Sequence, residues 1–365
     1  MKAVTSGRRV RLAHHVVELD DGHSVGVSLG GHGMPLVFLH GLGLSRRAYL
    51  RLLSRVAGLG FLVVAVDAAG HGDTRDLSCD NSDFTDRVDL VIRTLDALGI
   101  DRAVFAGHSM GGRMALHLAA VVPDRALAVV LFDAAAGASF DAAVSIVMRS
   151  PRQMIRTVAG AVSDMHGDPF HMKVDALGRY LRMLGAVLLG RVLPQSGFTG
   201  AARAIMRSGQ STPLLRAMRD RHIPTMVLHG ECDAIVPFES ACDVADHTNA
   251  TLYRVRGACH SWLIANPGHG ADSVRQLLDG PLGAVLQSTA AQLGMNDWRD
   301  SGEWERALIK PEAWVRRVND GIHLIGVDED DPVGMEVVRR AVRLPTVEHV
   351  AAVSSLCRSR NARTA

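Results

Sequence analysis

One short segment of the chain combines a serine with the glycines that a sharp turn needs. Ser109 is the third residue of Gly-His-Ser-Met-Gly at 107–111, which follows an apolar run and precedes apolar residues at helical spacing. A strand, a sharp turn and a helix are the setting of a nucleophile elbow, in which the serine hydroxyl is exposed at the tip of the turn. Glycine suits Gly107 and Gly111 because the backbone passes close to its neighbours there. The segment predicts a nucleophilic serine, although the pentapeptide alone also fits a glycine-rich turn with a solvated serine.

Two loops downstream of Ser109 carry an acid and a histidine that could activate it. A serine hydroxyl needs a base to take its proton, and the base needs a third group that orients it. Asp233 follows the apolar run at 225–230, and His260 follows the run at 252–255. Both runs predict buried strands. Parallel strands end at one edge of a sheet, so we expect these side chains to meet Ser109 there.

Apolar runs alternate with helical patterns through most of the first 280 residues. Each run is short and nearly continuous, as in parallel strands that are buried on both faces. The runs lie at 35–39, 61–66, 103–106, 127–132, 225–230 and 252–255, the last of which we expect to be the final strand. The patterns at 46–58 and 84–98 predict helices, and residues 10–31 predict an antiparallel hairpin at a sheet edge. This order predicts an α/β fold with a doubly wound, mostly parallel sheet.

The alternation of strands and helices stops in two places. Residues 138–222 are rich in Ala, Leu, Met, Val and Arg at helical spacing, and they predict a helical cap inserted between two sheet strands. The expected core is therefore divided into 1–137 and 223–280. Residues 281–365 predict a C-terminal extension that is mostly helical, and we expect the chain before it to fold without it.

Composition excludes several other classes of protein. The chain has 365 residues, of which 47% are hydrophobic, so it is not largely disordered. It has 40 basic and 38 acidic residues, which implies no nucleic-acid partner. Its five cysteines include no Cys-x-x-Cys pair, which favours free thiols in a reducing compartment. No apolar run approaches the ~18 residues of a transmembrane segment, and we expect a soluble cytoplasmic protein.

Five segments, taken in order, resemble the α/β-hydrolase superfamily, and in particular its serine hydrolases with a helical cap. The resemblance covers roughly residues 23–280, and the segments are 40–43, 67–74, 107–112, 230–237 and 257–260. It implies that Ser109 is the nucleophile, His260 the base and Asp233 the orienting acid. It also implies an oxyanion hole formed by the backbone N–H groups of Leu42 and Met110.

The sequence departs from the family pattern in three respects, one of which is that the cap at 138–222 does not match it in detail. Ala69 stands where an arginine or a similar residue is common, and nothing after about residue 280 matches the family.

Several other residues near these segments have competing interpretations. Asp133 also ends a predicted strand, but the loop of Asp233 matches the family pattern in its length and in its Pro237. His40 is expected to brace a loop, and His108 to pack beside the elbow. The other histidines are expected to be structural or exposed.

The resemblance implies acyl transfer without a metal or an organic cofactor. The expected reaction is cleavage of a carboxylic ester, or a related acyl bond, of an apolar small molecule through an acyl-enzyme. Serine at position 109 counts against epoxide hydrolases and haloalkane dehalogenases, which use aspartate at the elbow. Carbon–carbon bond hydrolases, cofactor-free haloperoxidases and small-ligand receptors of this fold remain open alternatives. The C-terminal extension could serve contacts between copies of the chain or with a partner.

Overall fold

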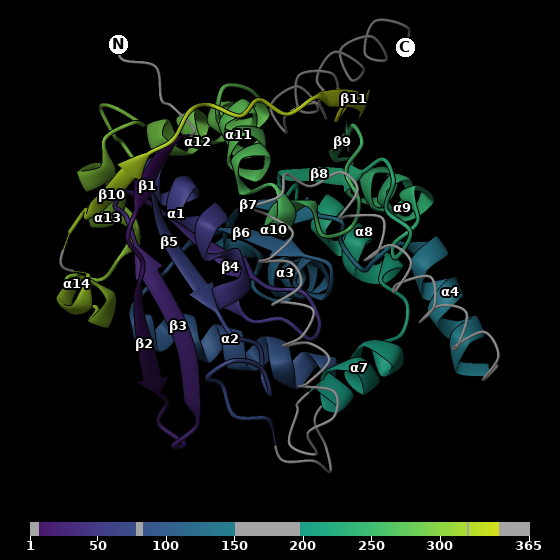
Figure 1. Cartoon of the computed structure of the whole chain (residues 1–365). Coiled ribbons are helices and arrows are strands. Elements are labelled where there is room, and N and C mark those ends of the chain that lie inside the picture. Colours follow the sequence, from purple (N-terminus) through teal and green to yellow (C-terminus); the bar gives the residue numbers. More distant parts are fainter. Residues whose placement is uncertain (1–6, 78–82, 150–197, 320, 343–365) are drawn as a thin grey trace, which may run out of the picture.

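A nine-stranded sheet is the centre of the fold. The structure is a computed structural model that describes residues 7–77, 83–149, 198–319 and 321–342 (Figure 1). The strand order within these residues is β11-β9-β8-β7-β6-β4-β5-β3-β2. The strands are β2 Ala13–Glu18, β3 Ser24–Gly30, β4 Met34–Leu39, β5 Phe61–Val66, β6 Ala103–His108, β7 Ala126–Phe132, β8 Thr225–Gly230, β9 Thr251–Val255 and β11 Met335–Arg339.

The sheet has the predicted parallel centre and antiparallel edges. Strands β5, β4, β6, β7, β8 and β9 are parallel to one another in that order. The predicted hairpin is formed by β2 and β3, which join the sheet as an antiparallel edge beside β5. The predicted doubly wound, mostly parallel sheet is therefore confirmed.

Helices cover both faces of the sheet, so the central strands are buried on both sides (Figure 1). Successive side chains of a strand point to opposite faces. In β5, accordingly, Val63 belongs to one apolar cluster and Val64 to the other, and both are fully buried. This burial explains why the sequence of the central strands is a continuous apolar run rather than an alternating one.

The helices of the core follow the strands that they connect. They are α1 Leu50–Gly58, α2 Phe84–Leu98, α3 Met110–Val121, α9 Phe238–Thr248, α10 Trp262–Ala265 and α11 Pro267–Leu278. The α2 helix begins at a capping box in which the Asp83 side chain accepts from the Asp86 amide, and it ends at Gly99 with φ 75°. None of the helices in the described ranges is long and apolar enough to cross a lipid bilayer.

The predicted cap is helical where the structure describes it. Its described helices are α4 Ala138–Arg149, α7 Phe198–Arg207 and α8 Thr212–Asp220. Residues 150–197, which make up the middle of the predicted cap, lie outside the described residues. The domain boundaries at 137 and 222 remain predictions.

The C-terminal extension adds three helices and two strands to the described chain. They are α12 Pro281–Gln292, α13 Ser301–Leu308, α14 Trp314–Val318, β10 Leu324–Val327 and β11. β10 pairs with β1, Arg8–Val10, in a separate two-stranded sheet, whereas β11 pairs antiparallel with β9. The expectation that residues 252–255 form the last strand of the main sheet is therefore wrong, because β11 follows them in that sheet. β11 is half-exposed and partly charged, so its sequence lacks the apolar run of a buried strand.

The extension is part of the main hydrophobic core. Leu282, Leu286, Trp304 and Leu308 are at most 3% exposed, and they belong to the apolar cluster that includes Val63. These residues cover one face of the sheet. The packing does not support the expectation that residues 1–280 fold without the extension. A helical pattern in the sequence predicts an apolar face, but it does not tell which surface that face will cover.

Candidate active site

Ser109 lies in a strained turn between β6 and α3. Its backbone has φ 55° and ψ −117°, a combination that non-glycine residues rarely adopt. A β-carbon at Gly107 would lie 2.2 Å from the Gly111 carbonyl oxygen, and one at Gly111 would lie 2.0 Å from the Leu39 carbonyl oxygen. Both positions therefore require glycine. The turn has the strand-turn-helix geometry that the sequence predicts for a nucleophile elbow.

The carboxyl ends of four neighbouring parallel strands lie side by side, and they form the edge of the sheet at which Ser109 lies. β6 leads into Ser109, β7 into Asp133, β8 into the loop of Asp233, and β9 into the loop of His260. These four strands are consecutive in the sheet, so their following loops are side by side. The sheet thus brings together residues that lie up to about 150 positions apart in the sequence.

Asp233 holds the imidazole of His260. The Nδ1 atom of His260 lies 2.8 Å from Oδ2 of Asp233. The other oxygen, Oδ1, accepts hydrogen bonds from the amides of Ile235 and Val236 at 2.8 and 2.9 Å. Burial alone would raise the pKa of Asp233, but the charge of His260 and its hydrogen bond outweigh burial and lower the pKa to about 2. Asp233 is therefore ionised at neutral pH and accepts the Nδ1 proton, which leaves Nε2 of His260 as the basic nitrogen.

Asp133 has different partners, although it ends the neighbouring strand. Its Oδ1 accepts from the Gly230 amide at 2.7 Å, and its Oδ2 accepts from the indole Nε1 of Trp262 at 2.7 Å. Its backbone has φ 47°, and its side chain is fully buried. Burial and the charge of Asp233 raise its pKa well above the ordinary value. The carboxyl of Asp133 thus joins β7 to β8 and to α10.

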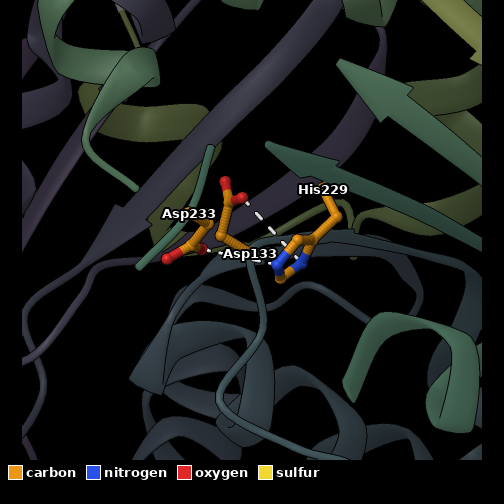
Figure 2. A group of neighbouring side chains, drawn as sticks. All are labelled: Asp133, His229 and Asp233. Atoms are coloured by element: carbon orange, nitrogen blue, oxygen red, sulfur yellow. Dashed lines mark ion pairs between the residues drawn. The ribbon is translucent and has the colours of Figure 1, made fainter. Parts of the chain in front are cut away.

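The ring of His229 faces both aspartates and lies within ion-pair distance of each (Figure 2). Its Nε2–H donates to the Val236 carbonyl oxygen at 2.8 Å and lies 3.5 Å from Oδ2 of Asp233. Its Nδ1 lies 3.9 Å from Oδ1 of Asp133. Burial lowers the pKa of His229, so the ring is neutral near pH 7. His229 was expected only to be structural or exposed, because the fold alone shows that this position of β8 faces both carboxylates.

The carboxylates of Asp133 and Asp233 and the imidazole of His229 lie close together, and these groups are also common metal ligands. Their oxygens, however, already accept hydrogen bonds from protein donors. Both oxygens of Asp133 are used in this way, and both oxygens of Asp233 are as well. The arrangement therefore fits a buried hydrogen-bonded network that supports His260 better than it fits a metal site.

Two histidines fix the loop that contains Leu42. The Nδ1–H of His40 donates to the Gly41 carbonyl oxygen at 2.9 Å, and its Nε2 accepts from the Ala68 amide at 2.9 Å. His71 accepts from the Gly43 amide at Nε2, at 3.2 Å. Burial lowers the pKa of each histidine to about 4, so both are neutral near pH 7.

The expected loop-bracing role of His40 is therefore confirmed. Because the peptide group is planar and trans, the Leu42 N–H points away from the Gly41 carbonyl that His40 holds. The other expected oxyanion donor, Met110, is the first residue of α3, where helix N–H groups carry partial positive charge.

Arg113 connects the elbow helix to the cap, a role that the sequence analysis missed. Its side chain is 1% exposed, and it donates to Oδ1 of Asp141 at 2.6 Å and to the Gly209 carbonyl at 2.7 Å. Oδ2 of Asp141 in turn accepts from the amide and the hydroxyl of Ser211. Arginine on an otherwise apolar helix face was the only signal in the sequence, and it does not name a partner.

Comparison with known proteins agrees with the fold. Residues 34–267 match the family model of the alpha/beta hydrolase fold. A protein of Mycobacterium phage D29 named as a non-heme haloperoxidase is 41% identical over 266 residues, which cover 72% of this chain and 94% of the relative. A bifunctional esterase/perhydrolase of Acinetobacter calcoaceticus is 27% identical over 219 residues, which cover 58% of this chain and 78% of the relative. Among solved structures, an esterase of Thermogutta terrifontis has a TM-score of 0.57 at 21% identity, covering 75% of this chain and 99% of that one. The chain belongs to the α/β-hydrolase family.

Proposed function

We propose that this protein is a serine hydrolase that cleaves a carboxylic ester, or a related acyl bond, of an apolar small molecule. The observation that carries the proposal is the 2.8 Å contact between His260 and the ionised Asp233, at the sheet edge where the elbow presents Ser109. An oriented imidazole at the same sheet edge as a serine in a strained turn is the arrangement that nucleophilic acyl transfer needs.

In the proposed reaction, the hydroxyl oxygen of Ser109 attacks the carbonyl carbon of the ester while Nε2 of His260 takes the hydroxyl proton. The N–H groups of Leu42 and Met110 bind the oxyanion that forms, and each such donor is worth about 3 kcal/mol of barrier. When the ester bond breaks, His260 gives its proton to the leaving alcohol. A water molecule then attacks the acyl-enzyme, with His260 again as the base, and releases the acid and free Ser109.

The composition of the predicted cap supports an apolar substrate. The predicted cap at 138–222 is rich in Met, Leu, Val and Ala, and methionine side chains adapt well to apolar ligands of irregular shape. The described part of this segment lies beside the elbow helix, to which Arg113 connects it. We therefore place the acyl group between the cap and the sheet edge.

Acyl transfer to hydrogen peroxide is a second candidate function. The names of two relatives, a non-heme haloperoxidase and an esterase/perhydrolase, favour it. The same acyl-enzyme would then react with hydrogen peroxide in place of water and release a peracid. This reaction would use the same serine, histidine and aspartate.

A series of p-nitrophenyl esters with acyl chains of increasing length tests the proposal, with Ser109→Ala as the control. We expect turnover with an optimum at one chain length, and no turnover above background in Ser109→Ala. Peracid formation in the presence of hydrogen peroxide would favour the second candidate. A folded wild-type protein that cleaves none of the esters, or a Ser109→Ala variant that cleaves them as well as wild type, would contradict the proposal.

A further inference from the structure

We propose that Tyr49 and His108 form a buried positioning relay that links the oxyanion loop to the loop of the catalytic base. The inference rests on the proposed function, because it concerns the same site. Neither side chain touches the reacting atoms in this proposal. The relay instead holds the backbone on either side of Ser109 in one arrangement.

Three hydrogen bonds make up the relay. The Gly41 amide lies 3.2 Å from the Oη of Tyr49, and that Oη lies 2.8 Å from Nδ1 of His108. Nε2 of His108 lies 2.8 Å from the backbone carbonyl oxygen of His260. Tyr49 ends the short 3-10 helix Arg46–Tyr49, and it is completely buried.

The partners at the two ends fix the place of every proton in the relay. The His260 carbonyl can only accept, so Nε2 of His108 carries a hydrogen. Burial and the neighbouring His260 lower the pKa of His108 to about 3, so the ring is neutral and its Nδ1 accepts the hydrogen bond of the Tyr49 hydroxyl. Burial raises the pKa of Tyr49, which keeps it a phenol. The Tyr49 oxygen then accepts from the Gly41 amide, and all donors point from Gly41 toward His260.

The relay touches each proposed catalytic element through the backbone. Gly41 precedes Leu42, the proposed oxyanion donor, and His108 precedes Ser109. At its other end the relay holds the main chain of His260, and the rings of His108 and His260 lie 4.8 Å apart. One unbroken chain of hydrogen bonds therefore sets the distance between the oxyanion loop and the base.

The packing around Gly41 leaves little room for another arrangement. A β-carbon at Gly41 would lie 3.1 Å from Nδ1 of His108, 3.2 Å from the Tyr49 Oη and 3.5 Å from the Ser109 β-carbon. The first two distances are shorter than most β-carbon contacts, and the third is an ordinary van der Waals contact. The close approach indicates that the loop, the relay and the nucleophile are positioned together.

Tyr49→Phe is the direct test, because it removes only the hydroxyl that joins the two halves of the relay. We expect kcat for a p-nitrophenyl ester to fall about tenfold while KM changes less than twofold, since one lost hydrogen bond is worth about a factor of ten. Tyr253→Phe is the matched control, because Tyr253 of β9 is also buried but lies outside the relay. We expect it to leave both constants unchanged.

Two substitutions of His108 separate positioning from simple packing. In His108→Gln, the amide can donate to the His260 carbonyl and accept from Tyr49, whereas His108→Leu can do neither. We expect the glutamine variant to keep kcat within about threefold of wild type and the leucine variant to lose well over tenfold. An unchanged kcat in folded Tyr49→Phe, or equal losses in the two His108 variants, would overturn the relay.

NMR of protein labelled with nitrogen-15 in histidine tests the relay without any assay of turnover. We expect a His108 signal with a bare Nδ1 and a protonated Nε2, and a shift of its Nδ1 in Tyr49→Phe. A His108 with a protonated Nδ1 would overturn the proposal even in an active enzyme. Absence of esterase activity together with the expected spectrum would instead count against the proposed function and leave the relay standing.

Discussion

The edge of the sheet around Ser109 and the C-terminal extension both contain buried side chains, but these side chains are held by different interactions. At the site edge, the buried side chains include Asp133, His108 and His40, which are at most 2% exposed and hydrogen-bonded. In the extension, the most buried side chains are apolar, among them Leu282 and Trp304. Polar contacts have strict directions, whereas apolar burial depends mainly on area.

This difference predicts two kinds of mutant. At the site edge, a substitution that keeps the shape but changes a donor or acceptor should alter turnover, because it moves a catalytic group or changes its charge. In the extension, a substitution that removes apolar volume should lower stability and leave the chemistry unchanged. The predictions below test this separation, beginning with the largest effect.

Asp233→Asn should lower kcat by roughly four orders of magnitude, because asparagine cannot hold His260 in the tautomer that leaves Nε2 basic. Asp133→Asn should lower kcat far less and should instead lower the free energy of unfolding, since one of its two buried donors would lose an acceptor. Steady-state kinetics and urea unfolding of both variants provide the measurements. The reverse ranking of kcat would mean that Asp133 is the orienting acid.

Trp304→Ala should lower the free energy of unfolding by about 3–5 kcal/mol, because it leaves a large cavity beneath the extension. The side chain is 3% exposed, and its Nε1 donates to the Trp298 carbonyl. We expect kcat of the folded variant to stay within twofold of wild type. Denaturant unfolding that matches wild type would show that the extension contributes little to the core, as the sequence alone led us to expect.

Stability should fall as the pH decreases from about 6.5 to about 4. Burial lowers the pKa of His40 and His71 to about 4 and that of His108 to about 3, so the folded state does not take up protons that the unfolded state binds below about pH 6.5. Each of these histidines should contribute up to about 1.4 kcal/mol per pH unit within this window, and nothing above it. The raised pKa of Asp133 acts in the opposite direction and offsets part of the loss.

Urea unfolding at several pH values measures how the free energy of unfolding changes per pH unit. His71→Gln should reduce this change by the contribution of one histidine. If the free energy of unfolding stays constant or increases as the pH is lowered from 6.5 to 4.5, these rings are not held neutral in the folded protein.

The same contrast explains which parts of the structure the sequence predicted. The strand at 61–66 and the helix at 84–98 agree with the structure at every residue, because a continuous apolar run and a glycine that ends a helical pattern are local signals. β1 was missed because it is three residues long and pairs with β10, which lies more than 300 residues away in the chain. No local pattern records such a pairing.

The sequence likewise predicted only those residues of the candidate site that lie in recognisable motifs. Ser109, Asp233 and His260 lie in motifs, and the structure places them at one sheet edge. Tyr49 and Arg113 were missed, because each looks like an ordinary member of a helical segment until the fold supplies its partners. The signal for such residues is a polar side chain at a position that the helical pattern predicts to be buried.

Covalent labelling by a fluorophosphonate tests the central claim most directly, because the probe reacts with a serine only when a base activates it. We predict one label per folded wild-type chain, located on Ser109 by peptide mass spectrometry, no label in Ser109→Ala, and greatly slowed labelling in Asp233→Asn. Folded, catalytically active protein that is not labelled, or that carries the label on another residue, would contradict the account.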